Sequence, residues 1–252
     1  MKQQIIVIKI GGNAVTQLPD SFFQQLARWR QQGQKILIVH GGGPKISQLS
    51  TELHLAVKKI AGVRVTDAAT LELTKAVLLG LVQPELLSKL SAHHLPVIGL
   101  NAGCNQLLQG HYLDQAKYGE VGVLDQLNTA WLTQILSREI GVLAPLAQTT
   151  DGKWLNVNAD TAAAEIATKL NASKLVLLTD VPGVLSAGEV VPELSQQKAH
   201  TMIAADIIKS GMTPKIKAAF AALNHGVQQA FITDDLTHTG TTFITQKAGI
   251  AQ

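Results

Sequence analysis

The chain has little of what marks several special classes of protein. It has one cysteine, Cys104, among 252 residues, so an internal disulfide and a multi-cysteine metal site are both excluded, which favours a reducing compartment such as the cytoplasm. Aromatic residues make up 4% of the chain, and its net charge of +3 comes from scattered lysines and arginines, which argues against nucleic acid as a partner. The sequence has no apolar run near the roughly 20 residues of a membrane span and no signal-peptide pattern, so we expect no membrane partner.

What the chain does have is short apolar runs that alternate with amphipathic segments. Residues 5–8 and 36–39 are continuous apolar runs, and the segment 174–178 is apolar after its first residue, Lys174; all three are typical of strands buried on both faces. A helix predicted from Asp20 to Gly33 joins the first two, so they form a right-handed βαβ unit in a parallel sheet. The polar, low-periodicity stretch 106–123 predicts small antiparallel strands outside that sheet. We therefore expect an α/β fold.

Glycine turns follow the first two strands. Lys9, near the end of the first strand, precedes Gly11 and Gly12, and a lysine there is costly unless its ammonium group meets an anion. Three glycines and a proline, residues 41–44, follow the second strand and open a helix, so free N–H groups and the helix dipole converge on one anion site. The alternative for Lys9 is a solvated side chain, and the alternative for residues 41–44 is a flexible turn that binds no anion.

Polar residues crowd the start of a helix predicted over 161–170. Asn156, Asn158 and Asp160 lie within five residues. Either Asn158 or Asp160 is expected to cap the helix, and because capping needs only one side chain, the others suggest a site. Arg64 lies just before another helix, which we expect Thr66 to cap. The guanidinium group of Arg64 is suited to bind a ligand carboxylate, and the alternative is that Arg64 forms a surface salt bridge.

The last third adds a turn and a lysine. The strand 174–178 ends in a polar turn that begins with Thr179 and Asp180, at the carboxyl end of a parallel strand, where such sheets bind ligands. Lys215 lies in the first turn of a predicted helix, where its charge opposes the helix dipole. A bound polyphosphate would reverse the sign of that interaction.

Six motifs occur in order along the chain and together resemble the amino acid kinase family. The motifs are Lys9 to Asn13, Val39 to Pro44, Arg64 to Asp67, Asn156 to Asp160, Leu178 to Gly183 and Gly211 to Lys215, and the similarity runs to Thr245. The resemblance implies an open three-layer αβα sandwich around a mainly parallel sheet of about eight strands. It also implies that residues 1–171 bind an acyl amino acid and form dimer contacts, and that residues 172–252 bind the nucleotide.

The resemblance implies roles for individual residues. The implied catalytic residues are Lys9 and Lys215, which stabilise the moving phosphoryl group, and Asp160, which orients both lysines. The implied substrate-binding residues are Gly42, Gly43, Arg64, Asn156 and Asn158, with Arg64 and Asn156 binding the α-carboxylate and acetamido group. The implied nucleotide-binding residues are Gly11, Gly12, Thr179, Asp180, Gly183, Lys209 and Gly211. The segment 231–235 departs from the family pattern.

The expected reaction is phosphorylation of the γ-carboxylate of N-acetyl-L-glutamate by ATP, with Mg²⁺ held through the phosphates rather than by protein ligands. A carboxylate is already ionised at neutral pH, so no general base is needed. Alternative acceptors are an acylated aminoadipate, carbamate or glutamate. A ligand-sensing module without turnover is a further alternative, but it predicts loss of a lysine, and both Lys9 and Lys215 are present.

The resemblance also carries an expectation about assembly. Arginine-inhibited members of the family have an extra helix before the first strand, which interlaces dimers into a hexamer. Here the first strand begins at about Ile5, and the four residues before it are too few for a stable helix. We therefore expect a homodimer, formed through the N-terminal part, that does not respond to arginine.

Overall fold

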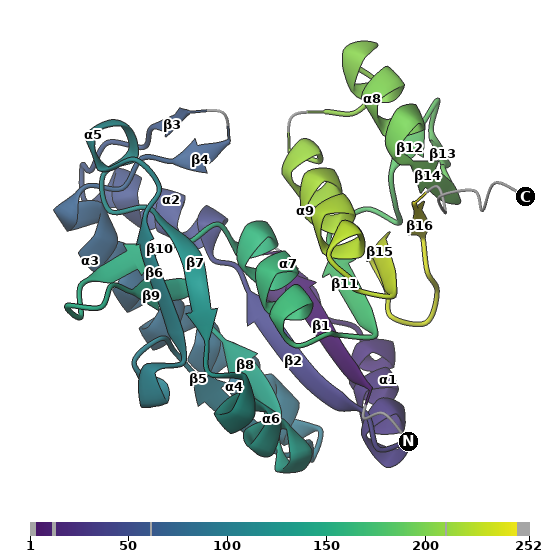
Figure 1. Ribbon diagram of the computed structural model, residues 1–252, viewed down its shortest axis with the longest axis horizontal. Helices are drawn as coiled ribbons and strands as arrows, with labels where there is room; N and C mark the ends of the chain where they lie inside the picture. Colours follow the sequence, from purple (N-terminus) through teal and green to yellow (C-terminus); the bar gives the residue numbers. More distant parts are fainter. Residues whose placement is uncertain (1–3, 12–13, 61, 210, 246–252) are drawn as a thin grey trace, which may run out of the picture.

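The fold is built on one sheet of eight strands, seen in Figure 1 (a computed structural model, which describes residues 4–11, 14–60, 62–209 and 211–245). In order across the sheet the strands are β14 (Glu193–Ser195), β16 (Thr241–Ile244), β15 (Gln229–Thr233), β11 (Lys174–Leu178), β1 (Ile5–Ile10), β2 (Lys35–His40), β8 (Ile140–Leu143) and β5 (Val97–Leu100). Neighbouring strands pair in parallel, except that β15 and β16 are antiparallel. The predicted mainly parallel sheet is confirmed.

Helices cover both faces of this sheet and make the three layers. Successive side chains of β1 alternate between two cores: Ile5 and Val7 join one, while Ile6 and Ile8 join the other. The first core includes α6 (Thr129–Arg138), α7 (Ala159–Lys169), α8 (Gln196–Ala204) and α9 (Thr213–Asn224), and the second includes α1 (Asp20–Gln31), α2 (Gly43–Glu52), α3 (Ala68–Val77) and α4 (Gln83–Ala92). The predicted αβα sandwich is therefore confirmed, with β1 near its centre.

One predicted helix cap is wrong. The side chain of Asp67, rather than that of Thr66, caps α3 by accepting a hydrogen bond of 2.8 Å from the amide of Thr70. Thr66 is buried and donates its hydroxyl to the carbonyl of Arg64 instead. A π-helical turn, Leu78–Val82, links α3 to α4, so the two helices form one long element against the sheet.

The remaining strands lie outside the main sheet. A smaller sheet has the order β10 (Trp154–Asn156), β9 (Leu146–Gln148), β6 (Leu108–Tyr112) and β7 (Gly122–Leu127), and the antiparallel pair β6–β7 confirms the prediction for 106–123. Pro145, which lacks an N–H group, separates β8 in the main sheet from β9 in the smaller one. Shorter elements are the hairpins β3 (Lys59–Ile60) with β4 (Val63–Arg64) and β12 (Leu185–Ser186) with β13 (Glu189–Val190), helix α5 (Gln115–Tyr118), and 3-10 turns at Ala14–Gln17 and Cys104–Gln106. None of the helices in the described ranges is long and apolar enough to cross a membrane.

Candidate active site

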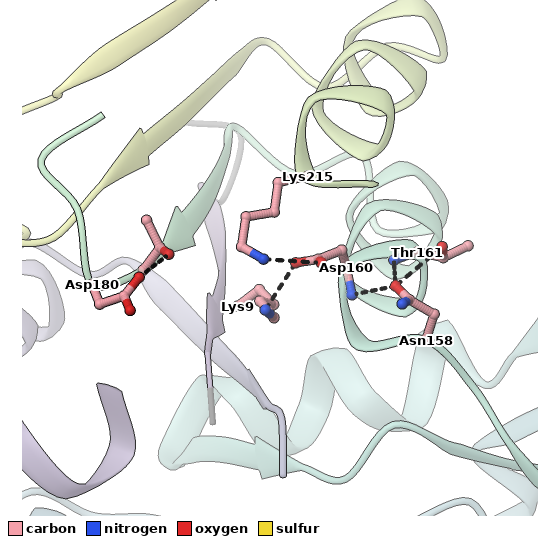
Figure 2. Close-up of polar contacts among 7 residues, drawn as sticks. Lys9, Asn158, Asp160, Thr161, Asp180 and Lys215 are labelled. Carbon is pink, nitrogen blue, oxygen red and sulfur yellow. Dashed lines mark hydrogen bonds and ion pairs between the residues drawn. The ribbon is translucent and has the colours of Figure 1, made fainter. Parts of the chain in front are cut away.

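A buried aspartate between two lysines lies at the carboxyl end of β1. The Nζ atom of Lys9 is 2.9 Å from one carboxylate oxygen of Asp160, and the Nζ atom of Lys215 is 3.4 Å from the other. Figure 2 shows the two lysines reaching this carboxylate from β1 and α9, while Asp160 itself projects from α7. Lys9 is 5% exposed and Asp160 6%. The three predicted catalytic residues are thus brought together.

Local structure explains why these three side chains converge. Lys9 follows Ile5 and Val7 in the alternation of β1, so it faces the layer that contains α7 and α9. Asp160 lies in the first turn of α7, where the positive end of the helix favours a carboxylate. Lys215 lies in the first turn of α9, where the helix end disfavours a cation, and the Asp160 carboxylate offsets this cost.

The charge of Lys9 is finely balanced. Burial lowers the pKa of Lys9 below its ordinary value of 10.5, the Asp160 carboxylate opposes that shift, and the positive charge of Lys215 adds to it. One carboxylate faces two ammonium groups, so the cluster has an excess of positive charge. A bound anion, such as a phosphoryl group, would offset this excess.

The glycine turn after β2 presents backbone donors beside this cluster. The N–H groups of Gly42 and Gly43 have no acceptor among the described residues, and they begin α2. A Cβ atom at Gly42 would lie 2.7 Å from the side chain of Leu78, so a larger residue here would require that side chain to shift. The Gly11 amide, in contrast, donates to the carbonyl of Leu178 and is not available to a ligand. Gly12 lies outside the described residues.

Arg64 reaches the glycine turn from the hairpin β3–β4. One of its terminal nitrogens donates to the carbonyl of Gly43 at 3.1 Å and to the hydroxyl of Ser47 at 2.6 Å. The other terminal nitrogen is buried without a partner in the part of the chain that the structure describes. Burial lowers the pKa of Arg64 from its ordinary value. A buried, unpaired guanidinium nitrogen is costly, so the site calls for a carboxylate or phosphate there.

The two asparagines have different partners. Asn156 donates its amide nitrogen to the hydroxyl of Thr66 at 3.0 Å, which leaves its side-chain oxygen as an acceptor toward a ligand. Asn158 caps α7, because its side-chain oxygen accepts from the amides of Asp160 and Thr161 at 3.0 and 3.1 Å (Figure 2). This selects Asn158 from the two predicted caps and leaves only its amide nitrogen for a ligand.

Two cavities meet at the lysine–aspartate cluster. We call the first the central cavity; it measures about 340 Å³ and is lined by residues that include Lys9, Gly42, Gly43, Arg64, Asn156, Asn158 and Asp160. We call the second the flanking cavity; it also measures about 340 Å³ and is lined by residues that include Gly183, Leu185, Ile207, Lys209, Gly211 and Met212. Thr179, Asp180 and Lys215 line both. The described site residues thus divide between two compartments with a shared wall.

Several residues of the site were not predicted from the sequence. Ser47 and Lys59 belong to the central side, and Leu185 and Ile207 belong to the flanking side. Ser47 looks like any polar residue on a helix, and it becomes a partner of Arg64 only through tertiary packing. Leu185 and Ile207 are 37% and 43% exposed, and a run of sequence gives no sign of which apolar side chains will stay in contact with solvent.

Comparison with known proteins places this geometry in a family. The family model described as "Amino acid kinase family" matches residues 4–234. The chain belongs to the amino acid kinase family. The acetylglutamate kinase of Lactiplantibacillus plantarum is 55% identical, over 97% of this chain and 99% of that protein. The acetylglutamate kinase of Leuconostoc citreum is 48% identical, over 94% of this chain and 97% of that protein.

Solved structures show the same architecture. The Streptococcus mutans protein smu.665 superposes with a TM-score of 0.91 at 38% identity and covers 95% of this chain and 98% of its own. The carbamate kinase of Giardia lamblia has a TM-score of 0.66 at 16% identity, with 97% of this chain and 99% of that chain covered, so it shares the fold alone. The family resemblance predicted from the six motifs is confirmed.

Proposed function

We propose that this protein is an acetylglutamate kinase, which transfers the γ-phosphoryl group of ATP to the γ-carboxylate of N-acetyl-L-glutamate in arginine biosynthesis. The observation that carries the proposal is the pair Lys9 and Lys215 on one buried carboxylate, Asp160, where two cavities meet. Relatives 55% and 48% identical over almost the whole chain carry the name acetylglutamate kinase, which supports the choice of acceptor.

We assign the acceptor to the central cavity. The unpaired guanidinium nitrogen of Arg64 would bind the α-carboxylate, and the free side-chain oxygen of Asn156 would accept from the acetamido N–H group. The unpaired amides of Gly42 and Gly43 would hold the γ-carboxylate and the incoming phosphoryl group. Carbamate has neither an α-carboxylate nor an acyl amide, so these donors and acceptors favour an acyl amino acid.

We assign ATP to the flanking cavity. Leu185 and Ile207 offer apolar surface that is exposed without a ligand, which suits the faces of a nucleobase. Lys215, at the wall shared with the central cavity, would then face the phosphates. Gly183, Lys209 and Gly211 line the same cavity, which supports a nucleotide-binding role for them. Gly11 lines the central cavity, where we propose that it lies beside the transferred phosphoryl group.

The chemistry requires charge neutralisation and alignment. An oxygen of the ionised γ-carboxylate forms a bond to the γ-phosphorus, and the bond from that phosphorus to the bridging oxygen of ADP breaks. Lys9 and Lys215 offset the repulsion between the two anions and stabilise the charge that develops during transfer. Asp160 would hold both ammonium groups in place and in direction.

Mg²⁺ would enter with ATP. It supplies further charge neutralisation on the β- and γ-phosphates. Within the described residues no group of three or more His, Cys, Asp or Glu side chains is placed to hold a metal ion. We propose that the phosphate oxygens would hold the ion, as the family resemblance implies.

The assembly and the location stay predictions. We propose a homodimer formed through residues 1–171, with residues 172–252 carrying the nucleotide, although the main sheet takes four strands from each part. We also propose a cytoplasmic location and an activity that does not respond to arginine. Light scattering, and activity measured with millimolar arginine, would test them.

A coupled assay of ADP release tests the proposed function. The purified protein is given ATP and, in turn, N-acetyl-L-glutamate, N-acetyl-L-aminoadipate, L-glutamate and carbamate. We expect release with N-acetyl-L-glutamate to exceed that with each other acceptor. Faster release with another acceptor would change the substrate assignment, and release with none of them would favour the ligand-sensing alternative.

A further inference from the structure

Two cations face each other across the hairpin β3–β4. Lys59 and Arg64 are register partners in this antiparallel pair, so their side chains leave the same face of the hairpin. Both side chains line the central cavity. Like charges directly opposite each other in a sheet are destabilising, so the pairing of Lys59 with Arg64 costs free energy as it stands.

Neither cation is neutralised by a side chain. No carboxylate in the described ranges lies within ion-pair distance of Lys59 or Arg64. One terminal nitrogen of Arg64 donates hydrogen bonds to the carbonyl of Gly43 and the hydroxyl of Ser47. Its other terminal nitrogen is buried and unpaired. An anion bound between the two side chains would attract both cations and offset the repulsion between them.

We infer that Lys59 is a second acceptor-binding cation, which acts with Arg64 on the non-reacting α-carboxylate of the acyl amino acid. The inference rests on the proposed function, because it needs a dianionic acceptor in the central cavity. Its place in the fold separates Lys59 from the reacting atoms: it lies on the hairpin with Arg64, whereas Lys9, Asp160 and Lys215 come from β1, α7 and α9.

Lys59 stands at the mouth of the site rather than at its base. It is exposed, and it also lines a neighbouring cavity of about 890 Å³ between the hairpin, α7 and α9. In Figure 1 this hairpin lies at the upper left, across from α9. A solvated cation at this place can strengthen acceptor binding, but it does not stabilise the transferring phosphoryl group. It is therefore a positioning and specificity-determining residue, not a catalytic one.

The chain offers a matched control for the test. Lys58 is the neighbouring residue, is also exposed, and does not line the central cavity. Lys59→Gln and Lys58→Gln remove the same charge one residue apart. We expect Lys59→Gln to raise the KM for N-acetyl-L-glutamate about two- to fivefold, the range for an exposed ion pair, with kcat and the KM for ATP unchanged. Lys58→Gln should leave all three constants unchanged, and Lys59→Arg should restore the wild-type KM.

Two further arms identify the group that Lys59 contacts. With the α-carboxamide analogue of N-acetyl-L-glutamate, wild type and Lys59→Gln should have the same KM, because the charge that Lys59 recognises is gone. The KM difference for the natural acceptor should shrink as salt is raised to 1 M, where the Debye length is about 3 Å.

Three results would overturn the inference. They are equal effects of Lys58→Gln and Lys59→Gln, a fall in kcat for Lys59→Gln, and a KM effect that persists with the carboxamide. A wild-type enzyme that releases no ADP with N-acetyl-L-glutamate would instead contradict the proposed function. An active wild type with an unchanged KM in Lys59→Gln contradicts this inference alone.

Discussion

The central and flanking cavities have about the same volume but differ in the side chains that only one of them contains. The central cavity is walled by charged and hydrogen-bonding groups, among them Lys9, Arg64 and Asp160, each held by a strand end, a hairpin or a helix start. The flanking cavity offers the apolar side chains of Leu185 and Ile207. Binding in the central cavity therefore depends on charged groups held at fixed positions. Binding in the flanking cavity depends more on apolar contact, so it should tolerate side-chain substitutions better.

The largest effect should come from removing a charge where the cavities meet. Lys215→Ala, and likewise Lys9→Ala, should lower kcat by about 10² to 10³, the usual cost of losing one preorganised donor to a transition state. Lys217→Ala is the control, because Lys217 is an exposed residue of the same helix that lines neither the central nor the flanking cavity. Steady-state kinetics and a melting curve on each preparation make the measurement. A variant at position 9 or 215 with near-wild-type kcat would show that charge does not organise the centre.

Within the central cavity, geometry should matter more than charge alone. Arg64→Lys keeps the charge but loses the planar guanidinium group, so we expect the acceptor KM to rise roughly tenfold or more, the cost of a charge-assisted hydrogen bond. The KM for ATP is the internal control and should not change. Arg138→Lys at the end of α6 provides a second control. If Arg64→Lys lowers the melting temperature and leaves the acceptor KM unchanged, Arg64 is a structural residue.

Acid should lower the stability of the folded chain through a histidine at the end of β2. Burial lowers the pKa of His40, just before the glycine turn, from 6.5 to about 4. Between these values the unfolded chain binds a proton that the folded chain does not, so the free energy of unfolding falls as the pH drops. From pH 7 to pH 5 this one group should cost wild type about 2 kcal/mol. Denaturant unfolding of His40→Asn should show a correspondingly weaker pH dependence, while exposed His200→Asn should match wild type. Equal slopes for wild type and His40→Asn would contradict the assignment.

A smaller kinetic effect than that of Arg64→Lys should come from the flanking cavity. Ile207→Ser removes apolar surface that we assign to the nucleobase, so the KM for ATP should rise roughly fivefold, with the acceptor KM unchanged. Leu113→Ser changes a similarly exposed apolar residue that lines neither cavity. Its kinetic constants should equal those of wild type. A larger effect at Ile207 than at Arg64 would reverse the comparison between the two cavities.

Parts of the charged site and of the fold can be recognised from the sequence. Lys9 at the end of a buried strand is costly without a counter-charge, and Asp160 crowds a helix start that needs only one cap, so both can be recognised from their positions. The parallel sheet follows from β-branched runs separated by helices. Thr66 is the wrong cap because Asp67, one residue later, accepts from the amide of Thr70, while the Thr66 hydroxyl donates to the carbonyl of Arg64.

Other parts of the site depend on contacts that no local pattern encodes. Ser47 becomes the partner of Arg64 only when the hairpin packs against α2. The like-charge pair of Lys59 and Arg64 depends on the register of a two-residue strand pair, and the sequence does not set that register by itself. Leu185 lies in β12 and Ile207 lies between α8 and α9, and no local sequence pattern shows that both side chains line the flanking cavity.

The central claim is that the two cavities hold a carboxylate and ATP so that a phosphoryl group passes between them at Lys9, Asp160 and Lys215. Trapping the product with hydroxylamine tests it most directly, because an acyl phosphate reacts to give a hydroxamate and phosphate. The enzyme is incubated with ATP, magnesium and N-acetyl-L-glutamate, with Lys215→Ala as the matched control. The account predicts γ-hydroxamate that forms in step with ADP, requires both substrates, and is strongly reduced in the variant. ADP release without hydroxamate, or equal hydroxamate from the variant, would contradict it.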